Sequence, residues 1–415
     1  MSENSGSGQE TEEQSAFRAH CRNWLAEHTP PLPNFVPVTS GVEVVTDEQL
    51  SYYSRWQKSA YDGGLVGADY PQAYGGGGKT ECQVIANQEM LRAKTPILPG
   101  TIGLGMAAPT ILHHASEDLK QRLLPPLLSG EELWCQGFSE PGAGSDLAGV
   151  QTSAVRTDHG TWVINGHKVW TSTAQFASWM ILLTRTDKSD RYNGMTYFVV
   201  PIKSELGKSV TVRPLIKITG ETGFNEVLFD NLEVDDSLRL DAVGKGWQVA
   251  MTTLLHERNA GGLVTPMSGG QAVESKADLD SGHQRLLDLA SSCQRNGRPA
   301  IEDPVLSDKV MQLTTRLEGI KQHRKLRKVS GLANAERMGL QEKLLVTEYR
   351  QKAAAVALEI EGLASTLSPL DDAAPDNGHW PLAYLSSFGG TIAAGTSEIQ
   401  KNILGERVLG LAKSK

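Results

Sequence analysis

The spacing of apolar residues changes twice along this chain, and that change restricts the possible folds more than any other feature of the sequence. Over residues 13–130 apolar side chains recur every three or four positions, for example at Phe17 and Cys21, which predicts amphipathic helices. Over residues 134–243 they occur in short runs separated by Gly, Asn and Asp, which predicts strands joined by turns. Helical spacing returns after Gly244. Helices, then strands, then helices predict three subdomains and argue against an alternating βαβ sheet.

These changes of pattern set the expected domain boundaries. We expect a helical N-terminal domain at residues 15–130, a β-rich middle domain at 131–243 and a helical C-terminal domain at 244–415. A chain of 415 residues is long enough for two or three packed domains. Residues 1–14 are small, polar and acidic, which predicts a disordered tail. Residues 265–282 are rich in Gly, Ser and Asp, which predicts a loop between helices.

The composition argues against several classes of protein. A formal net charge of −8 and a pI near 5.7 disfavour a general nucleic-acid or anionic-membrane binder, because the field of the protein would repel phosphate. No apolar run approaches the roughly 20 residues that cross a bilayer. The four cysteines lack CxxC spacing, which argues against a disulfide framework or a zinc site and favours the reducing cytoplasm. The sequence therefore predicts a soluble cytoplasmic protein without a metal site.

Two segments in the strand-rich middle carry the residue types that a flavin needs. They are WCQGFSEPGAGSD at 134–146 and NGHKVWTS at 165–172. A flavin ring offers a flat apolar face to an aromatic side chain, and an edge of carbonyls and nitrogens to hydroxyl and backbone N–H groups. Together with PQAYGG at 71–76, GTSEIQ at 395–400 and ERVLGL at 406–411, these segments resemble the acyl-CoA dehydrogenase family over nearly the whole chain.

The resemblance implies a fold, a cofactor and partners. It implies an α+β multidomain protein with a helical N-terminal domain, a β-barrel-like middle domain and a C-terminal four-helix bundle. The implied cofactor is FAD, and the implied substrate is an acyl-CoA. Electrons would leave to an electron-transfer flavoprotein. Members of the family assemble as dimers or tetramers, so a homo- or hetero-oligomer is expected.

The resemblance also implies roles for individual residues. Ser139 would lie near the pyrimidine edge of the flavin, Trp170 against the ring and Ser172 near N5, while Ser145 would lie where the acyl-CoA chain passes. The cofactor-binding residues expected in this way are Gln136, Phe138, Ser139, Trp170, Ser172, Thr396 and Glu398. The alternative is structural: the two serines cap turns and Trp170 fills the core.

The base that removes the α-proton stands at an unusual place in this sequence. Many members of the family carry a Glu directly before the GTSEIQ-type motif, and that position is Ala394 here. The backbone N–H of Ala394 can still hold a thioester carbonyl, but its side chain cannot accept a proton. A second branch places the Glu on the first helix of the C-terminal domain, directly before an Arg, which corresponds here to Glu257 and Arg258. We therefore expect Glu257 as the base and Arg258 as a residue that orients the acid or the substrate; an ordinary ion pair of Glu257 is the alternative.

These features predict FAD-dependent α,β-dehydrogenation of an acyl-CoA to the 2-enoyl-CoA, and two alternatives stay open. One is a flavin oxidase or monooxygenase on the same scaffold. The other is a non-catalytic subunit that completes the FAD site of a homologous partner. The absence of an acid at 394 favours the second alternative, as does the segment at 295–299, which lacks the family's Arg-x-x-Phe-Gly pattern. The complete set of Ser139, Trp170 and Ser172 opposes it.

Overall fold

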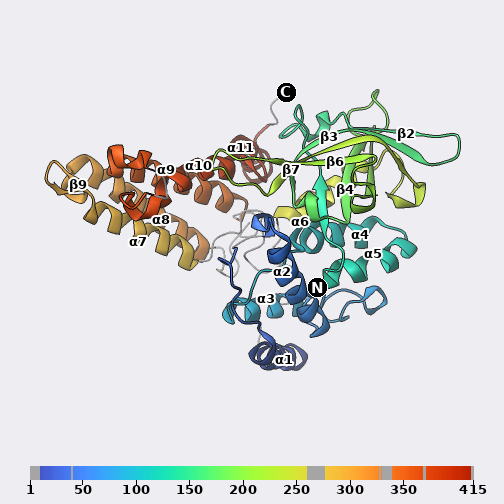
Figure 1. The fold of residues 1–415 in the computed structure, drawn as a ribbon, viewed down its shortest axis with the longest axis horizontal. Coiled ribbons are helices and arrows are strands. Elements are labelled where there is room, and N and C mark those ends of the chain that lie inside the picture. Colours follow the sequence, from blue (N-terminus) through green and yellow to red (C-terminus); the bar gives the residue numbers. More distant parts are fainter. Residues whose placement is uncertain are drawn as a thin grey trace. The chain divides into compact units, whose positions relative to one another are not determined.

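The computed structural model describes residues 10–38, 41–258, 276–326, 329, 339–367 and 371–412. The chain divides into two compact units, one within residues 7–270 and the other within residues 271–415. The first unit contains helices followed by a sheet, and the second is helical apart from a short hairpin (Figure 1). The expected order of helices, sheet and helices is therefore confirmed, and each unit is described here by itself.

Within residues 10–38 and 41–133, five α-helices precede the sheet. They are α1 (Glu12–His28), α2 (Asp47–Asp62), α3 (Cys82–Arg92), α4 (Ala108–His114) and α5 (Glu117–Ser129). The first two begin with capping boxes, in which Thr11 pairs with Gln14 and Thr46 with Gln49, so their first N–H groups are satisfied locally. The cap at Thr11 places the start of α1 inside the segment expected as a tail, while residues 1–9 lie outside the described part of the chain.

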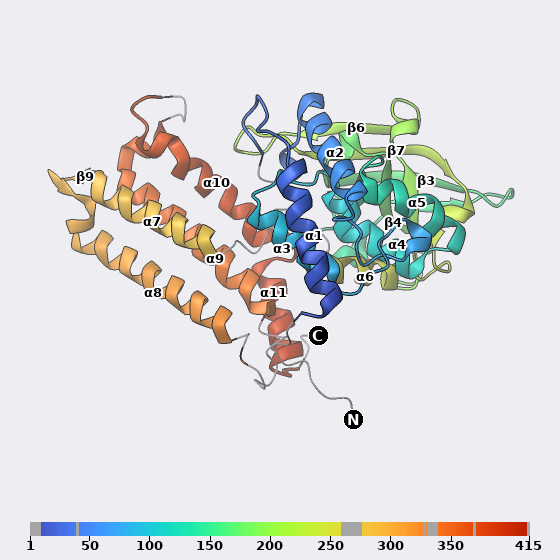
Figure 2. The same ribbon diagram turned by 90° about the horizontal axis from the view of Figure 1, so that it is seen from below.

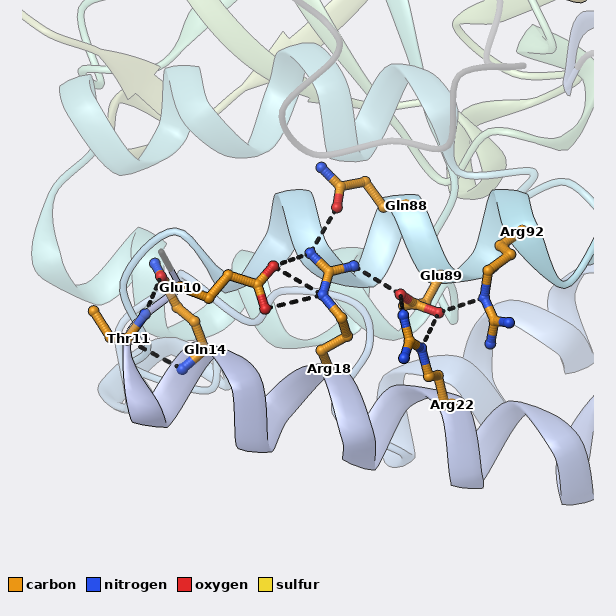
Figure 3. Close-up of polar contacts among 8 residues, drawn as sticks. All are labelled: Glu10, Thr11, Gln14, Arg18, Arg22, Gln88, Glu89 and Arg92. Carbon is orange, nitrogen blue, oxygen red and sulfur yellow. Dashed lines mark hydrogen bonds and ion pairs between the residues drawn. The ribbon is translucent and has the colours of Figure 1, made fainter. Parts of the chain in front are cut away.

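A cluster of charged residues joins α1 to α3 (Figure 3). At its centre is Glu89 of α3, whose side chain is only 2% exposed. Glu89 accepts hydrogen bonds from Arg18 at 2.7 Å, from Arg22 at 3.0 Å and from Arg92 at 2.7 Å. Arg18 also pairs with Glu10, so the residues just before α1 are tied to the same cluster. One buried carboxylate thus holds three guanidinium groups from two helices.

The middle of the chain forms one mixed sheet. Its strands are β1 (Trp134–Gly137), β2 (Ser153–Arg156), β3 (Trp162–Ser172), β4 (Trp179–Arg185), β5 (Met195–Pro201), β6 (Val210–Leu215), β7 (Phe224–Val234) and β8 (Arg239–Leu240). The strand order is β6-β7-β3-β2-β4-β5-β8, with β1 pairing to β4. The β1–β4 and β2–β4 pairs are parallel and the others antiparallel. The N-terminal helices gather on one side of this sheet (Figure 1).

The helix α6 (Gly246–Arg258) follows the sheet and packs into the first unit. It contacts α4 and β5. The buried hydroxyl of Thr253 hydrogen-bonds both to Thr110 and to the phenol of Tyr197, each at 2.9 Å. Although the sequence suggested a separate helical domain over 244–415, these contacts attach its first helix to the sheet and to the N-terminal helices.

The second unit is a helical bundle. Its helices are α7 (Lys276–Ser292), α8 (Pro304–Leu326), α9 (Gly339–Glu361), α10 (His379–Ile392) and α11 (Ser397–Ile403). The first four run side by side, with α9 in contact with the other three (Figure 2). Residues 276–282 were expected to be loop, but α7 begins there because Leu279 starts an apolar stripe that continues to Leu286 and Leu289. No helix in the described ranges is long and apolar enough to span a membrane.

Candidate functional site

The loop after β1 presents Ser139 at the edge of the sheet. Gly137, the last residue of β1, lies so close to β4 that an added Cβ would stand 2.4 Å from the sulfur of Met180. The ring of Phe138 is buried and meets the ring of Tyr197 edge-on, with 5.8 Å between centroids. Ser139 follows and is half-buried. The side chain of Phe138 therefore anchors the loop in the core. Because this ring is buried, Phe138 can contact a ligand only through its backbone.

Trp170 is turned outward by a break in strand β3. The β3–β7 pairing shifts register between Lys168 and Thr171, so Val169 and Trp170 form a bulge. Trp170 has a φ of +61°, a conformation unusual for a bulky side chain, and its indole is 60% exposed. Its only aromatic neighbour in the described residues is Phe224, which it meets edge-on at 6.0 Å. An exposed indole on a left-handed backbone fits a surface that receives a planar ligand, and contradicts the alternative in which Trp170 fills the core.

The end of β3 is held by side-chain amides. Asn225 donates to the backbone oxygen of Thr171 at 3.1 Å and to Gln175 at 2.7 Å. Ser172 pairs with Phe224 in the ladder and is half-buried. The hydroxyl of Thr171 is buried, and it has no hydrogen-bond partner within the described part of the chain. These bonds fix the backbone between the exposed indole and the hydroxyl of Ser172.

A buried ion pair lies behind the same loop. Lys168 of β3 has no exposed side-chain surface and donates to Phe138 O at 3.0 Å and to Glu140 at 2.8 Å. Glu140 also accepts the backbone N–H groups of Gln151 at 2.7 Å and Thr152 at 2.9 Å. Sequence reasoning did not single out either charge. The signal was there: Lys168 has the same parity as the buried Trp162 and Ile164, at a position that an alternating strand turns inward.

Glu257 lies in the last turn of α6, on the side of the sheet that carries Tyr197. Its side chain is half-buried. Burial raises the pKa of the Tyr197 phenol well above its usual range, the hydrogen bond with Thr253 opposes this, and the charge of Glu257 raises the pKa further. Glu257 lies one turn after Thr253 on α6, and Thr253 hydrogen-bonds to the tyrosine whose ring packs against Phe138. Arg258 ends α6, and its side chain lies outside the described residues.

The remaining expected residues of the first unit lie at the surface. Ser145 is exposed in the turn after Glu140. Its neighbour Asp146 pairs with Arg191 at 2.5 Å, which ties this turn to the loop between β4 and β5. Gln136 is half-buried on β1. The first unit therefore carries Gln136, Phe138, Ser139, Ser145, Trp170, Ser172 and Glu257.

The GTSEIQ motif forms a tight turn in the second unit. Ala394 has a φ of +52° and Gly395 a φ of +92°, so two successive residues are left-handed. The side-chain amide of Gln400 donates to Ala394 O at 3.0 Å, and Lys343 donates to Gly395 O at 2.6 Å. Thr396 caps α11 by accepting the N–H of Ile399. These bonds fix the backbone at 394, where the side chain is only a methyl group.

Glu398 follows in the first turn of α11 and is exposed. A backbone N–H at the helix start and the hydroxyl of Thr396 hold the pKa of Glu398 below its usual value. Glu398 is thus an ionised surface carboxylate. Ala394, Thr396 and Glu398 share one short turn of the bundle.

The segment at 295–299 is a β-hairpin. Strands β9 (Gln294–Arg295) and β10 (Arg298–Pro299) pair through a turn at Asn296 and Gly297, both with positive φ. Arg295 donates to the backbone of Glu359 at 3.2 Å, and its guanidinium lies 3.6 Å from Asp303. The arginine at this position is therefore engaged within its own bundle.

No group of three or more His, Cys, Asp or Glu side chains in the described segments is arranged to hold a metal ion. Burial raises the pKa of Cys135 and Cys21 above the range of a reactive thiol. The chemistry that the first unit offers consists of an exposed aromatic ring, hydroxyl and N–H donors beside it, and one carboxylate on α6.

Comparisons with known protein families match three models that follow one another along the chain. They are described as the acyl-CoA dehydrogenase N-terminal domain at residues 11–131, the middle domain at 135–232 and the C-terminal domain at 244–409. The curated relatives include acyl-CoA dehydrogenase IpdE1 of Mycobacterium tuberculosis. It is 34% identical over 403 residues, which cover 96% of this chain and 97% of the relative.

Solved structures share the fold over the full length. The Tcur3481-Tcur3483 steroid ACAD matches with a TM-score of 0.71 and 23% identity, covering 98% of this chain and 99% of that one. The ChsE4-ChsE5 complex of Mycobacterium tuberculosis matches with a TM-score of 0.69 and 24% identity, with coverage of 98% and 99%. At these identities the likeness concerns the fold.

Proposed function

This chain belongs to the acyl-CoA dehydrogenase family, and on that premise we propose that it removes the α-proton and the β-hydrogen of an acyl-CoA, with FAD as the cofactor and Glu257 as the base. The product is the trans-2-enoyl-CoA. The cofactor, when bound, accepts the β-hydrogen with its electron pair at N5. The residues that suit an isoalloxazine are Ser139, Trp170 and Ser172.

The proton step is assigned to α6. The α-proton becomes acidic when the thioester carbonyl is polarised, and a carboxylate within reach can then accept it. Glu257 is half-buried and acts on the buried Tyr197. Tyr197 in turn packs against Phe138, next to Ser139. The observation that supports the proposal is the packing of α6 against this tyrosine: Thr253 of α6 hydrogen-bonds to the Tyr197 phenol at 2.9 Å, and the Tyr197 ring meets Phe138 edge-on.

Ala394 has a different part in this scheme. A methyl side chain cannot take a proton, but its backbone N–H remains available to a carbonyl oxygen. The left-handed conformation at 394 is held by bonds to the carbonyls of Ala394 and Gly395. We assign the polarisation of the thioester to this turn and the proton transfer to Glu257.

Anaerobic mixing with acyl-CoAs tests the proposal. Purified protein should carry FAD, and the correct acyl-CoA should bleach its absorbance near 450 nm. The panel should contain linear, branched and polycyclic acyl groups, the last because one structural neighbour is described as a steroid ACAD. Glu257→Gln should bind FAD and acyl-CoA but reduce its flavin about 10²–10⁴-fold more slowly.

The control is Glu131→Gln, which makes the same change at an exposed residue just after α5. It should bleach at the wild-type rate. Normal bleaching in Glu257→Gln would exclude Glu257 as the base. Loss of acyl-CoA binding in that variant, with an unchanged rate at saturation, would instead assign it to binding. Electron transfer is tested by adding an electron-transfer flavoprotein, and rapid reoxidation of reduced flavin by oxygen would point to the oxidase alternative.

A second candidate role is that of one subunit in a two-component enzyme. One structural neighbour is described as the ChsE4-ChsE5 complex and another carries the paired name Tcur3481-Tcur3483. In this chain the 295–299 hairpin keeps Arg295 within its own bundle. A partner would then complete the FAD site. The flavin content distinguishes the cases: about one FAD per chain in the protein alone supports an independent enzyme, and colourless protein that gains FAD on co-expression with a homologous partner supports the two-component form.

A further inference from the structure

The buried pair of Lys168 and Glu140 lies next to the flavin-facing loop but has no part in the chemistry proposed above. Lys168 is fully buried, which lysines almost never are unless they are paired. Its ammonium donates to Phe138 O at 3.0 Å and to Glu140 at 2.8 Å. The second oxygen of Glu140 accepts the N–H of Gln151 at 2.7 Å. The pair is therefore held on both sides in a fixed geometry.

The ammonium acts on one particular peptide group. The carbonyl of Phe138 belongs to the same peptide unit as the N–H of Ser139. That peptide is trans, because the described backbone contains no cis bond. In a planar trans peptide the C=O and the N–H point in opposite directions. Since the carbonyl points to buried Lys168, the N–H of Ser139 points away from it.

The next carbonyl along the loop is fixed as well. Val169, which follows Lys168 in β3, donates its N–H to Ser139 O at 2.9 Å. Strand β3 thus holds the carbonyls on both sides of Ser139, one by a charged donor and one by a neutral donor. The next residue of β3 is Trp170, whose exposed indole marks the ligand side. The position of the Ser139 N–H is therefore set by the strand that carries the indole.

Charge makes this hydrogen bond different from an ordinary one. An ionised donor forms a bond roughly twice as strong as a neutral one and polarises the peptide that accepts it. Burial lowers the pKa of Lys168, and the charge and hydrogen bond of Glu140 oppose this shift. Both partners of the amine, the Phe138 carbonyl and the Glu140 carboxylate, are acceptors, which is the environment of a protonated amine. Apolar side chains often replace buried ion pairs without loss of stability. Packing of this strand alone therefore does not explain why the side chain at position 168 is charged.

We propose that Lys168 is a positioning residue that polarises the Phe138–Ser139 peptide, so that the Ser139 N–H becomes a stronger donor to the pyrimidine edge of the bound flavin and favours its reduced form. Reduced flavin carries more negative charge at that edge, and a preorganised donor stabilises the state in which charge has developed. Glu140 keeps the ammonium in place. This inference rests on the proposed function, since it concerns the flavin of the same site.

The test is the reduction potential of bound FAD, measured with a reference dye on protein that has been loaded with FAD and freed of unbound FAD. The double variant Lys168→Met/Glu140→Gln removes both charges, while the amide oxygen at 140 can still accept a backbone N–H. We expect its preference for reduced over oxidised FAD to fall on the order of tenfold, which is about 30 mV for a two-electron couple. In the single variant Lys168→Met the preference for reduced FAD should fall at least as far, because Glu140 then loses its cationic partner.

The matched control is Arg185→Met. Arg185 is a second buried cation of the sheet, 6% exposed, that donates to the backbone oxygens of Ala148 and Val150 and does not contact the Phe138–Ser139 peptide. Its loss should lower thermal stability without changing the potential. A fall in potential shared by Arg185→Met would assign the effect to general loosening of the sheet and overturn the proposal.

The remaining outcomes also decide the question. An unchanged potential in the double variant overturns the inference while leaving the proposed function intact. Variants that stay folded but never load FAD would show that the pair builds the binding site and does not tune the flavin. A wild-type protein that fails to bind FAD, alone or with a partner, would instead refute the proposed function. If Lys168→Met does not fold, the double variant still gives the answer, because it contains no unpaired buried charge.

Discussion

Replacing Glu89 by Gln removes the negative charge at the centre of the cluster that joins α1 to α3. Burial alone would raise the pKa of Glu89, but hydrogen bonds from Arg22, Arg18 and Arg92 outweigh it and lower the pKa from 4.5 to about 2. A shift of about 2.5 units corresponds to about 3.4 kcal/mol in favour of the ionised folded form. Arg22 and Arg92 are 49% and 61% exposed, so solvent screens part of this. We expect Glu89→Gln to lower the free energy of unfolding of these helices by about 2 kcal/mol at pH 7.

The pH dependence of this effect follows from the same pKa. Because the folded-state pKa lies below the unfolded-state value, Glu89 stabilises the fold above pH 4.5, and the stabilisation is lost as the pH falls from 4.5 towards 2. About a quarter of it is lost at pH 4 and more than half at pH 3. The variant has no charge to titrate at this position. The difference between wild type and variant should therefore stay nearly constant from pH 7 to about pH 5 and then shrink to less than half by about pH 3.

Hydrogen–deuterium exchange of peptides covering α1 and α3, corrected for intrinsic rates at each pH, reports the local free energy of opening. The control is Glu13→Gln, the same change on α1 at a residue that is 63% exposed and 3.7 Å from its lysine partner. It should change stability by less than about 0.5 kcal/mol. Equal protection of wild type and Glu89→Gln at pH 7, or a difference that stays constant down to pH 3, would refute the reasoning.

Two further predictions concern the exposed indole of Trp170 and the helical bundle. Trp170→Ala should weaken FAD binding on the order of tenfold, while the melting temperature of the apoprotein stays almost unchanged because the indole is 60% exposed; FAD fluorescence quenching and calorimetry measure the two effects, and an unchanged FAD affinity would remove Trp170 from the site. Glu361→Gln should stabilise the bundle by on the order of 2 kcal/mol at pH 8, because burial first and the charge of Asp376 second raise the pKa of this carboxyl to about 7, and neither of its oxygens has a hydrogen-bond partner among the described residues. The penalty on the ionised form is present above pH 7 and disappears as the pH falls to 4.5, so thermal melts at pH 8 and pH 4.5 test it, and a lower melting temperature of the variant at pH 8 would contradict it.

Local pattern predicted the large features of the fold. The change from helical spacing to short apolar runs gave the order of helices, sheet and helices, because period and turn residues are properties of neighbouring positions. The local pattern gave the wrong prediction at the start of α7. Seven residues rich in Gly, Ser and Asp are helical there, because the apolar stripe that starts at Leu279 packs against α9. The N-terminal tail was also shorter than expected, because Thr11 caps α1.

The sequence predicted individual residues of the candidate site but not the contacts that position them. The resemblance to a family predicted roles for Ser139, Trp170, Ser172 and Glu257, and these roles stay predictions. The outward turn of Trp170 was not predictable, because it results from a bulge against β7 that depends on the register of two strands. Spacing within a helix also does not show that α6 packs against the sheet through Thr253 and Tyr197.

By itself, then, the sequence determined the order of helices, sheet and helices, which follows from local spacing, and the family, which follows from its ordered motifs; the flavin-binding roles of Ser139, Trp170 and Ser172 stay predictions of that resemblance. Only the tertiary structure decided that a fully buried lysine donates to the carbonyl of Phe138, that its carboxylate partner is Glu140, and that α6 hydrogen-bonds to Tyr197 through Thr253. The physical reason is that burial and hydrogen bonding join residues from separate elements. The charge state of each group depends on those neighbours and not on its own place in the chain.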